Sequence, residues 1–552
     1  MLFPTFDYLV FMVPVLLATW ALGHRAMARM VLLLLASYFF YCASPKTDPP
    51  PLPWFYAGLL VFSTFLDYAC GLALSWFTTG LDSEDPAVVA RTKRRRNVVL
   101  MVSLVGNLGL LGYYKYTDFF VDVFTDLVHA AGVPFVAPHL EIILPVGISF
   151  YTFQSLSYTI DVWRRRLEPE RSFIKFALFV TFFPQLVAGP IVRANELLPQ
   201  LHERPRLSPV MMEEGLFRIF KGLVKKVLLG DWIAAQFTDA VFASPEAYTS
   251  AEIMLALYAF TVQLYADFSG YSDIAIGSAR LLGYDIPENF DRPYQAKNLG
   301  EFWRRWHMTL STWLRDYLFF PLGGSRGSSA RTYFNLWLTM FLVGMWHYSP
   351  GTSWNFVIYA NVHGLAMLYN RWNRERRKDG PRWLRAVTVV TAAAAVGLGC
   401  GALAEYGLEV PREGALFCVG FGALMFVLVS WLPQHGGPWI TAVHVLLTYH
   451  FTVISRVFFR APDFDTAKAM VAGILRFDGD LVRPGLLTEP LWAALVLGTL
   501  YHFTPKRWVD DYAYGVFRRI PGPLLGLLLG LVGLGIMKLM AGTPRAFIYF
   551  NF

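Results

Sequence analysis

Long apolar runs recur along almost the whole chain, and they constrain the fold more than any other feature. A helix needs about 20 residues to cross roughly 30 Å of hydrocarbon. Runs of this kind cover residues 7–23, 30–43, 54–77, 97–116, 142–162, 173–192, 252–283, 386–405, 414–432, 439–459, 488–503 and 521–541. The sequence therefore predicts an all-α polytopic membrane protein with roughly a dozen embedded helices and several in-plane ones.

The composition agrees with a chain that lies mainly in lipid. Of 552 residues, 55% are hydrophobic and only 16% are charged, whereas soluble proteins carry about 25% charged residues. The polar connections are too short for an extramembrane domain. We therefore expect one membrane-embedded domain over 1–552, with N-terminal spans in 1–162, a central core at about 142–371 and C-terminal spans in 386–552.

The net charge of +8 is explained by membrane topology and not by nucleic-acid binding. Lys and Arg occur in short clusters between apolar runs, which is the positive-inside pattern. If Arg25 and Arg29 are cytoplasmic, the N-terminus lies outside, and the clusters Arg91–Arg96 and Arg164–Arg166 also fall inside. The bilayer is the partner that this pattern predicts.

The run 173–192 does not fit this alternation. Basic residues precede it and follow it, the second set being Arg204, Arg206, Arg218, Lys221, Lys225 and Lys226. A re-entrant segment would resolve the count, and Pro184 and Pro190 could break the helix. Non-helical backbone at membrane depth is tolerated only where protein or water satisfies it. We therefore expect 173–192 to line a cavity.

Polar, charged and histidine side chains gather between Asn289 and His363, inside otherwise apolar sequence. On a continuous helix, His307 would share one stripe with Arg304 and Ser311, while Trp306 would lie on the opposite side. One interpretation is an interfacial helix with Arg and Trp at the headgroup level. The other is a polar cavity that His307 faces.

A second histidine follows the apolar run 337–345. His347 precedes Ser349-Pro350-Gly351, where proline disfavours helix, and Thr352 or Ser353 could cap the next helix. His347 is therefore predicted at a helix break within the membrane, where ionisable residues are mostly functional. Asn355, Tyr359 and His363 recur every four residues beyond it, and this stripe fits either a site or polar helix–helix contacts.

The motifs that mark other reaction classes are missing from the sequence. It has no nucleophile elbow, P-loop, dinucleotide fingerprint or zinc HExxH motif, and its four cysteines lack metal-ligand spacing, so no metal is expected. What one or two buried histidines can do is general base catalysis. A neutral imidazole takes the proton of a hydroxyl, which attacks an acyl thioester while a nearby donor holds the oxyanion.

Several motifs resemble the membrane-bound O-acyltransferase (MBOAT) family. They are the blocks Gln263–Gly277, Asn289–Tyr294, Phe302–Tyr317 and Gly344–His347, extended by Leu144–Gln154, Phe183–Pro190 and Phe547–Phe552. They look most like the bacterial branch that includes the alginate O-acetylation membrane protein and the teichoic acid D-alanyl transfer protein. One residue departs from the pattern, because Tyr348 stands where members commonly have Gly.

The resemblance implies a ring of helices around a funnel or tunnel that crosses the membrane. It matches His347 to the catalytic histidine and His307 to the second active-site histidine. Trp306, Arg304, Ser311, Asp316, Asn355, Tyr359 and His363 are the expected substrate-binding residues. It also implies a bacterial inner-membrane enzyme without a bound cofactor, which takes an acyl group from acetyl-CoA or from an acyl carrier protein thioester.

The expected acceptor is a hydroxyl of an exported polysaccharide or of an extracytoplasmic partner protein. D-alanyl or other acyl transfer from a carrier protein remains an alternative. A transporter or flippase would use the same histidines as proton relays, although the lack of an internal repeat argues against an inverted-repeat transporter. A scaffold of an export complex would need neither His307 nor His347 for acylation.

Overall fold

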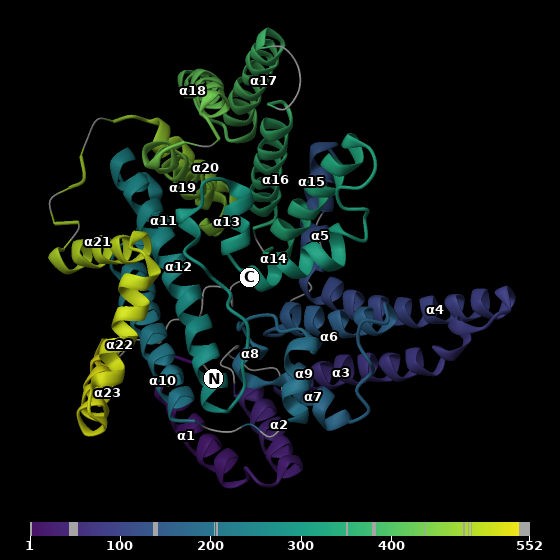
Figure 1. Ribbon diagram of the computed structural model, residues 1–552. Helices are drawn as coiled ribbons and strands as arrows, with labels where there is room; N and C mark the ends of the chain where they lie inside the picture. The colour runs from purple at the N-terminus through teal and green to yellow at the C-terminus, as the bar shows by residue number, and fades with distance from the viewer. Residues whose placement is uncertain are drawn as a thin grey trace.

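The computed structural model describes residues 3–43, 53–135, 142–203, 205, 208–348, 352–377, 382–434, 436–478, 481–483, 485–486 and 488–539. In this part of the chain every regular element is a helix (Figure 1). The first half contains α1 (Phe6–Ala21), α2 (Ala26–Cys42), α3 (Pro53–Trp76), α4 (Pro86–Leu111), α5 (Thr117–Ala130), α6 (Ile148–Trp163), α7 (Phe173–Thr181), α8 (Phe183–Leu186), α9 (Ala194–His202), α10 (Pro209–Leu223), α11 (Asp239–Ala243) and α12 (Ser250–Leu281).

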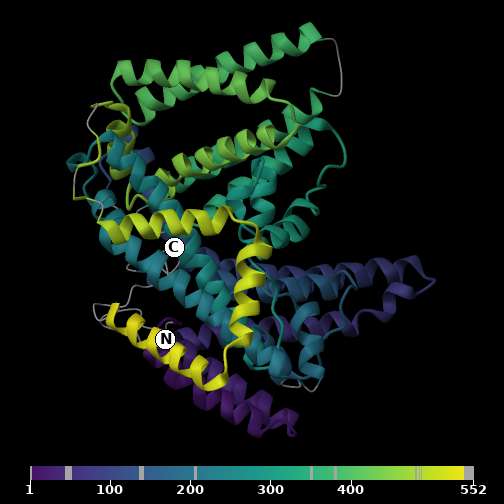
Figure 2. The ribbon, with the colours of Figure 1, turned by 60° about the vertical axis from the view of Figure 1, so that its left-hand side comes forward.

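The second half continues the all-helical pattern. It contains α13 (Leu299–Arg305), α14 (Met308–Leu314), α15 (Ser329–Trp346), α16 (Ser353–Glu375), α17 (Arg382–Ala402), α18 (Arg412–Trp431), α19 (Pro438–Arg460), α20 (Phe464–Leu475), α21 (Glu489–Phe503), α22 (Tyr512–Arg519) and α23 (Gly522–Leu539). In two views, α17 and α18 lie at one end of the molecule and α1 and α2 at the opposite end, while α3 and α4 project sideways (Figures 1 and 2).

The predicted membrane class is confirmed by the length and apolarity of the helices. Among the described residues, five helical segments are long and apolar enough to cross a bilayer: Phe55–Asp82, Pro86–Ala130, Arg385–Gly407, Arg412–Trp431 and Pro438–Arg460. Shorter apolar helices cover Phe6–Ala21, Ala26–Cys42 and Gly522–Gly535. The predicted spans 252–283 and 488–503 correspond to α12 and α21.

The run 173–192 is not one continuous helix, as its prolines predicted. It contains the short helices α7 and α8, and nearly the whole of it is buried. Protein groups satisfy its backbone: Gln154 and Gln185 donate to the carbonyl of Phe179, and Thr309 Oγ1 accepts from Ile191 N at 3.0 Å. This segment therefore packs directly against the region of His307.

The basic residues after this run do not all lie in a loop. Lys225 and Lys226 are buried in a π-helical stretch, Val224–Asp231, that follows α10. Lys225 pairs with Asp273 of α12 at 2.6 Å, and Lys226 pairs with Asp267 at 2.6 Å. Counting these two lysines as cytoplasmic loop charges was therefore wrong. Arg204 and Arg206, from the same count, lie outside the described residues.

Helix α12 is the element against which the polar groups are arranged. It starts with a capping box, in which Thr249 and Glu252 exchange hydrogen bonds with each other's backbone, and it is buried over most of its length. Helix α10 approaches it very closely. A Cβ atom on Gly270 would lie 2.7 Å from the carbonyl oxygen of Gly222. Only glycine allows this contact. It brings Lys225 and Lys226, which follow α10, to Asp273 and Asp267 of α12.

Candidate active site

The predicted helix through His307 is interrupted at this histidine. Helix α13 ends at Arg305, Trp306 is extended, and His307 has φ 43° and ψ 55°, after which α14 begins at Met308. The stripe of Arg304, His307 and Ser311 therefore does not exist. A left-handed conformation is costly for a non-glycine residue and often occurs at functional sites. Asn289 holds the break, because its backbone carbonyl accepts a hydrogen bond from Met308 N at 2.9 Å.

The break turns the imidazole of His307 into the interior. The side chain is fully buried, with the rings of Phe268, Phe150 and Trp346 at centroid distances of 4.8, 6.2 and 5.8 Å. Asn289 Oδ1 lies 3.2 Å from His307 Nδ1 and also accepts from Thr309 Oγ1 at 2.9 Å. Since this oxygen is an acceptor, Nδ1 carries the proton and the lone pair is on Nε2.

His347 occupies the C-cap position of α15, so the predicted end of the helix at this residue is confirmed. Its ring is 2% exposed and lies edge-on to Trp346 at 4.9 Å and to Phe459 at 5.6 Å. Trp346 therefore contacts both histidines. Ser349, Pro350 and Gly351 lie outside the described residues, and α16 follows with Thr352 at its N-cap position.

The stripe on α16 is buried and faces α19. Asn355 Nδ2 donates to the carbonyls of Ala461 and Asp463, at 3.1 and 3.0 Å, and His363 Nε2 lies 3.1 Å from Ser455 Oγ. Tyr359 Oη accepts from Arg456 Nη1 at 3.1 Å. The contacts of this stripe are polar helix–helix contacts, which is one of its two interpretations. Tyr359 also contacts the ring of Phe459, which in turn contacts His347.

Arg456 was not predicted from the sequence, although an arginine inside the apolar run 439–459 is a signal that could have found it. The side chain is 1% exposed. Its guanidinium lies over the rings of Trp306 and Phe459, at 5.0 and 5.3 Å from their centroids. Because Phe459 also contacts His347, Arg456 brings a permanent positive charge to the vicinity of the two histidines.

The remaining predicted site residues are dispersed. Trp306 is buried and stacks on Phe302 at 5.7 Å. Arg304 is exposed, and Ser311 donates to the carbonyl of Trp306. Asp316 forms ion pairs with Arg193 at 2.8 Å and with Arg315 at 2.7 Å. The structure thus gives Asp316 a partner on another segment of the chain. It buries Trp306 under the guanidinium of Arg456, whereas Arg304 is exposed.

Tyr348, which departs from the family pattern, is fully buried. Its ring stacks on Tyr116 at 5.9 Å and lies edge-on to Phe119 at 5.3 Å. Tyr116 Oη also donates to the carbonyl of Met345 at 3.1 Å. In this chain an aromatic contact with the π-helical turn Gly112–Tyr116 and with α5 therefore anchors the backbone directly after His347.

Comparison of the sequence with known proteins identifies the family. The family model of the membrane-bound O-acyltransferase family, MBOAT, matches residues 164–379. The chain is 41% identical over 373 residues to the probable alginate O-acetylase AlgI of Pseudomonas aeruginosa, covering 67% of this chain and 66% of that protein. It is 33% identical over 564 residues to the probable alginate O-acetylase AlgI of Pseudomonas syringae pv. tomato, covering 100% of both.

A third relative is named for a different acceptor. The chain is 35% identical over 500 residues to the peptidoglycan O-acetyltransferase of Helicobacter pylori, covering 82% of each protein. The chain therefore belongs to the membrane-bound O-acyltransferase family. It is an O-acyltransferase, as the resemblance of its motifs implied.

The hydrogen bond that His307 Nδ1 donates to Asn289 Oδ1 leads to a first prediction. Asn289→Ala removes the acceptor that fixes the tautomer and the orientation of His307, so we expect kcat to fall roughly 10- to 100-fold with KM little changed. Steady-state kinetics of the purified variant measure this. Asn361→Ala is the control. Asn361 Oδ1 accepts a hydrogen bond from Trp337 Nε1 where α15 packs on α16, and it has no hydrogen bond with His307 or His347. Equal kcat values for the two variants would contradict the role of Asn289.

Proposed function

We propose that this enzyme moves an acetyl group from a cytoplasmic thioester across the bacterial inner membrane to a hydroxyl of an exported polysaccharide or of an extracytoplasmic partner protein. Its relatives, which include two probable alginate O-acetylases and a peptidoglycan O-acetyltransferase, support both acetyl transfer and a polymeric acceptor. The donor is acetyl-CoA or an acetylated carrier protein, and no permanently bound cofactor takes part.

The observation that carries this proposal is the pair of histidines in contact with Trp346. Their rings lie at 5.8 and 4.9 Å from that indole, and both side chains are buried. Burial favours the neutral imidazole, which is the form that can accept a proton. Among the described residues, no group of three His, Cys, Asp or Glu side chains is arranged to hold a metal ion.

The reaction is a single acyl exchange. His347 takes the proton of the acceptor hydroxyl while that oxygen attacks the thioester carbonyl carbon, which forms a tetrahedral oxyanion. The guanidinium of Arg456 stabilises this negative charge. The intermediate collapses with cleavage of the C–S bond, and the imidazolium returns its proton to the leaving sulfur. His307, fixed by Asn289, assists through Nε2 by hydrogen bonding or by a second proton transfer.

Reconstitution tests the proposal. The purified protein in proteoliposomes is given radiolabelled acetyl-CoA on one side and an oligosaccharide or partner-protein acceptor on the other. We expect alkali-labile label, which indicates an oxygen ester, to accumulate on the acceptor. Parallel vesicles receive an acetylated or D-alanylated carrier protein, so that the donor and the acyl group are identified. Movement of unmodified polymer without label would instead support a flippase.

A further inference from the structure

A groove runs along the hairpin of α3 and α4, which projects sideways from the rest of the protein (Figures 1 and 2). Its volume is about 930 Å³ and it is wide open to the surroundings. Neither active-site histidine belongs to the lining. Helix α3 contributes Phe62 and Leu66, and one face of α4 contributes Ala90, Lys93, Arg94, Asn97, Val98, Met101, Val102, Val105 and Gly106.

The lining changes character along α4. Its residues on this helix recur at three- and four-residue spacing, so they form one stripe. The stripe is basic at Lys93 and Arg94, polar at Asn97 and apolar from Val98 to Val105. No carboxylate is found among the lining residues that the structure describes. A ligand that matches the stripe is an amphiphile with an anionic end and an apolar remainder.

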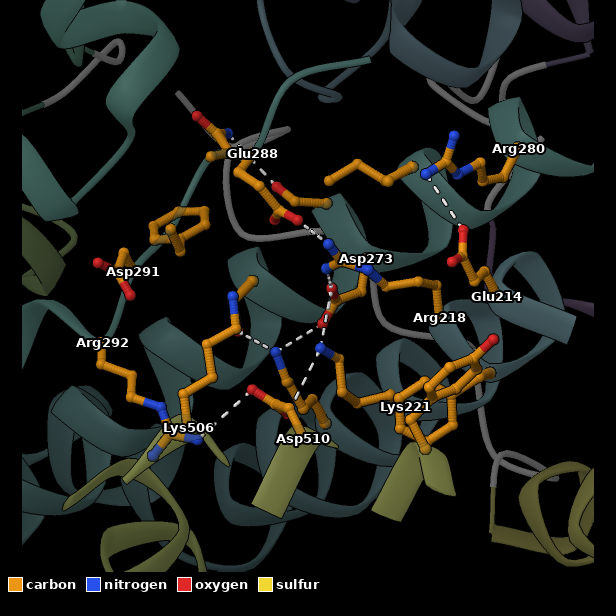
Figure 3. Close-up of a pocket in the computed structure, with 18 of the residues that line it drawn as sticks. Glu214, Arg218, Lys221, Asp273, Arg280, Glu288, Asp291, Arg292, Lys506 and Asp510 are labelled. Carbon is orange, nitrogen blue, oxygen red and sulfur yellow. Dashed lines mark hydrogen bonds and ion pairs between the residues drawn. The ribbon is translucent and has the colours of Figure 1, made fainter. Parts of the chain in front are cut away.

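The two cations of the groove differ from basic residues elsewhere in the protein. In the polar cavity between α10 and α12, Asp273 compensates the cations around it (Figure 3). These are Arg218, Lys221 at 3.5 Å and Lys225 at 2.6 Å. No ion pair of the described residues includes Lys93 or Arg94, and Asp82, in the turn between α3 and α4, pairs instead with Arg165 at 3.0 Å. Lys93 and Arg94 are therefore available to an anion from outside the protein.

The length of the groove matches one leaflet of a bilayer. Lys93 and Val105 are twelve residues apart, which is about 18 Å along a helix axis. A leaflet contributes half of a hydrocarbon core that is about 30 Å thick. Asn97 Oδ1 accepts from Trp163 Nε1 at 3.1 Å, and tryptophan is typical of the headgroup level. The change from polar to apolar lining therefore falls where headgroups give way to acyl chains.

The apolar walls suit an acyl chain better than a helix. The protein itself does not cover them, because five of their side chains are 50% to 64% exposed: Phe62, Val98, Met101, Val102 and Val105. A helix about 10 Å wide and about 18 Å long occupies roughly 1,400 Å³, which is more than the groove holds. The two walls also meet closely, since a Cβ atom on Gly106 would collide with Leu66.

We propose that this groove binds one anionic phospholipid, with its phosphate held by Lys93 and Arg94 and one acyl chain along Val98 to Val105. The basic cluster Arg91–Arg96 lies on the side that the positive-inside rule assigns to the cytoplasm, and the cytoplasmic leaflet presents anionic headgroups. A zwitterionic lipid fits less well, because its ammonium group is repelled by the same two cations. The site is separate from the acyl-transfer reaction.

Competition between two lipids tests the proposal. The purified protein in detergent is equilibrated with equal amounts of phosphatidylglycerol and phosphatidylethanolamine that carry the same acyl chains, and native mass spectrometry identifies what stays bound. The wild type should retain one phosphatidylglycerol. Each basic residue near an anionic headgroup strengthens binding about fivefold, so Lys93→Gln/Arg94→Gln should bind this lipid about tenfold to thirtyfold more weakly.

The matched control removes the same charge from the same two turns of α4. Arg91 and Arg95 are exposed and do not line the groove, so Arg91→Gln/Arg95→Gln should retain phosphatidylglycerol as the wild type does. Val98→Trp keeps both cations but fills the apolar part, and it should lose the lipid. Because all five changed residues are exposed, thermal midpoints in lipid-free detergent should be similar. Added phosphatidylglycerol should raise the midpoint of the wild type and the control only.

Several results would overturn the proposal. Wild-type retention by Lys93→Gln/Arg94→Gln or by Val98→Trp would show that the groove does not hold the lipid. Equal loss in Arg91→Gln/Arg95→Gln would show that the whole basic cluster acts as a diffuse charge. Equal retention of the two lipids would exclude recognition of the phosphate charge. A bound second copy of the chain that disappears in Val98→Trp would assign the groove to a protein contact instead.

Discussion

His347→Gln is expected to abolish acyl transfer while the protein still folds. Glutamine has a similar size and polarity but cannot take a proton at neutral pH, so the general base is lost without a cavity. A positioned general base contributes about 10²- to 10⁴-fold, and we expect a loss near the upper end because water is excluded from the ring. Single-turnover transfer from radiolabelled acetyl-CoA in proteoliposomes measures the chemical step directly.

The control for this variant is another histidine. His450 of α19 is exposed, and its Nδ1 lies 2.7 Å from the carbonyl of Leu446 on its own helix. His450→Gln should therefore transfer label at the wild-type rate. Thermal unfolding followed by size-exclusion chromatography should give similar midpoints for the wild type and both variants. Transfer by His347→Gln at the rate of the control would refute His347 as the base.

The sequence predicted most of the apolar helices because a membrane span leaves a long, simple signal. The runs 386–405, 414–432 and 439–459 correspond within a few residues to α17, α18 and α19. The signal fails where charges are paired inside the protein. Lys225 and Lys226 resemble loop charges, yet Asp273 and Asp267 compensate them within the helix contact. Only the three-dimensional pairing distinguishes a buried cation from a cytoplasmic one.

The break at His307 shows a second limit of the sequence. The residues from Phe302 to Tyr317 have a helical period and contain neither glycine nor proline, so local preference predicts one helix. Tertiary contacts override it: the carbonyl of Asn289 accepts from Met308 N, and Arg305 O accepts from Asp291 N, both at 2.9 Å. The histidine could be selected from the sequence, whereas its left-handed backbone, its contact with Asn289 and the nearby Arg456 could not.

Arg456→Met is expected to separate catalysis from stability. Methionine fills similar space between Trp306 and Phe459, and replacing a buried charge by an apolar side chain often leaves stability unchanged or raises it. Transfer should nevertheless fall about 10²- to 10³-fold, which is the usual effect of removing one oxyanion donor. Arg456→Lys keeps the charge but not the planar fork, so its rate should lie between that of the methionine variant and that of the wild type.

The matched control lies one turn further along α19. Arg460 pairs with Asp239 at 2.9 Å and its side chain is 26% exposed, away from both histidines. Arg460→Gln should keep the wild-type rate, because a partly exposed ion pair contributes at most about 1 kcal/mol to stability. A wild-type kcat in folded Arg456→Met would refute the oxyanion role. The oxyanion role would also be refuted if Arg456→Met failed to fold while Arg456→Lys kept full activity. Arg456 would then serve helix packing, through its stack on Trp306 and its hydrogen bond to Tyr359.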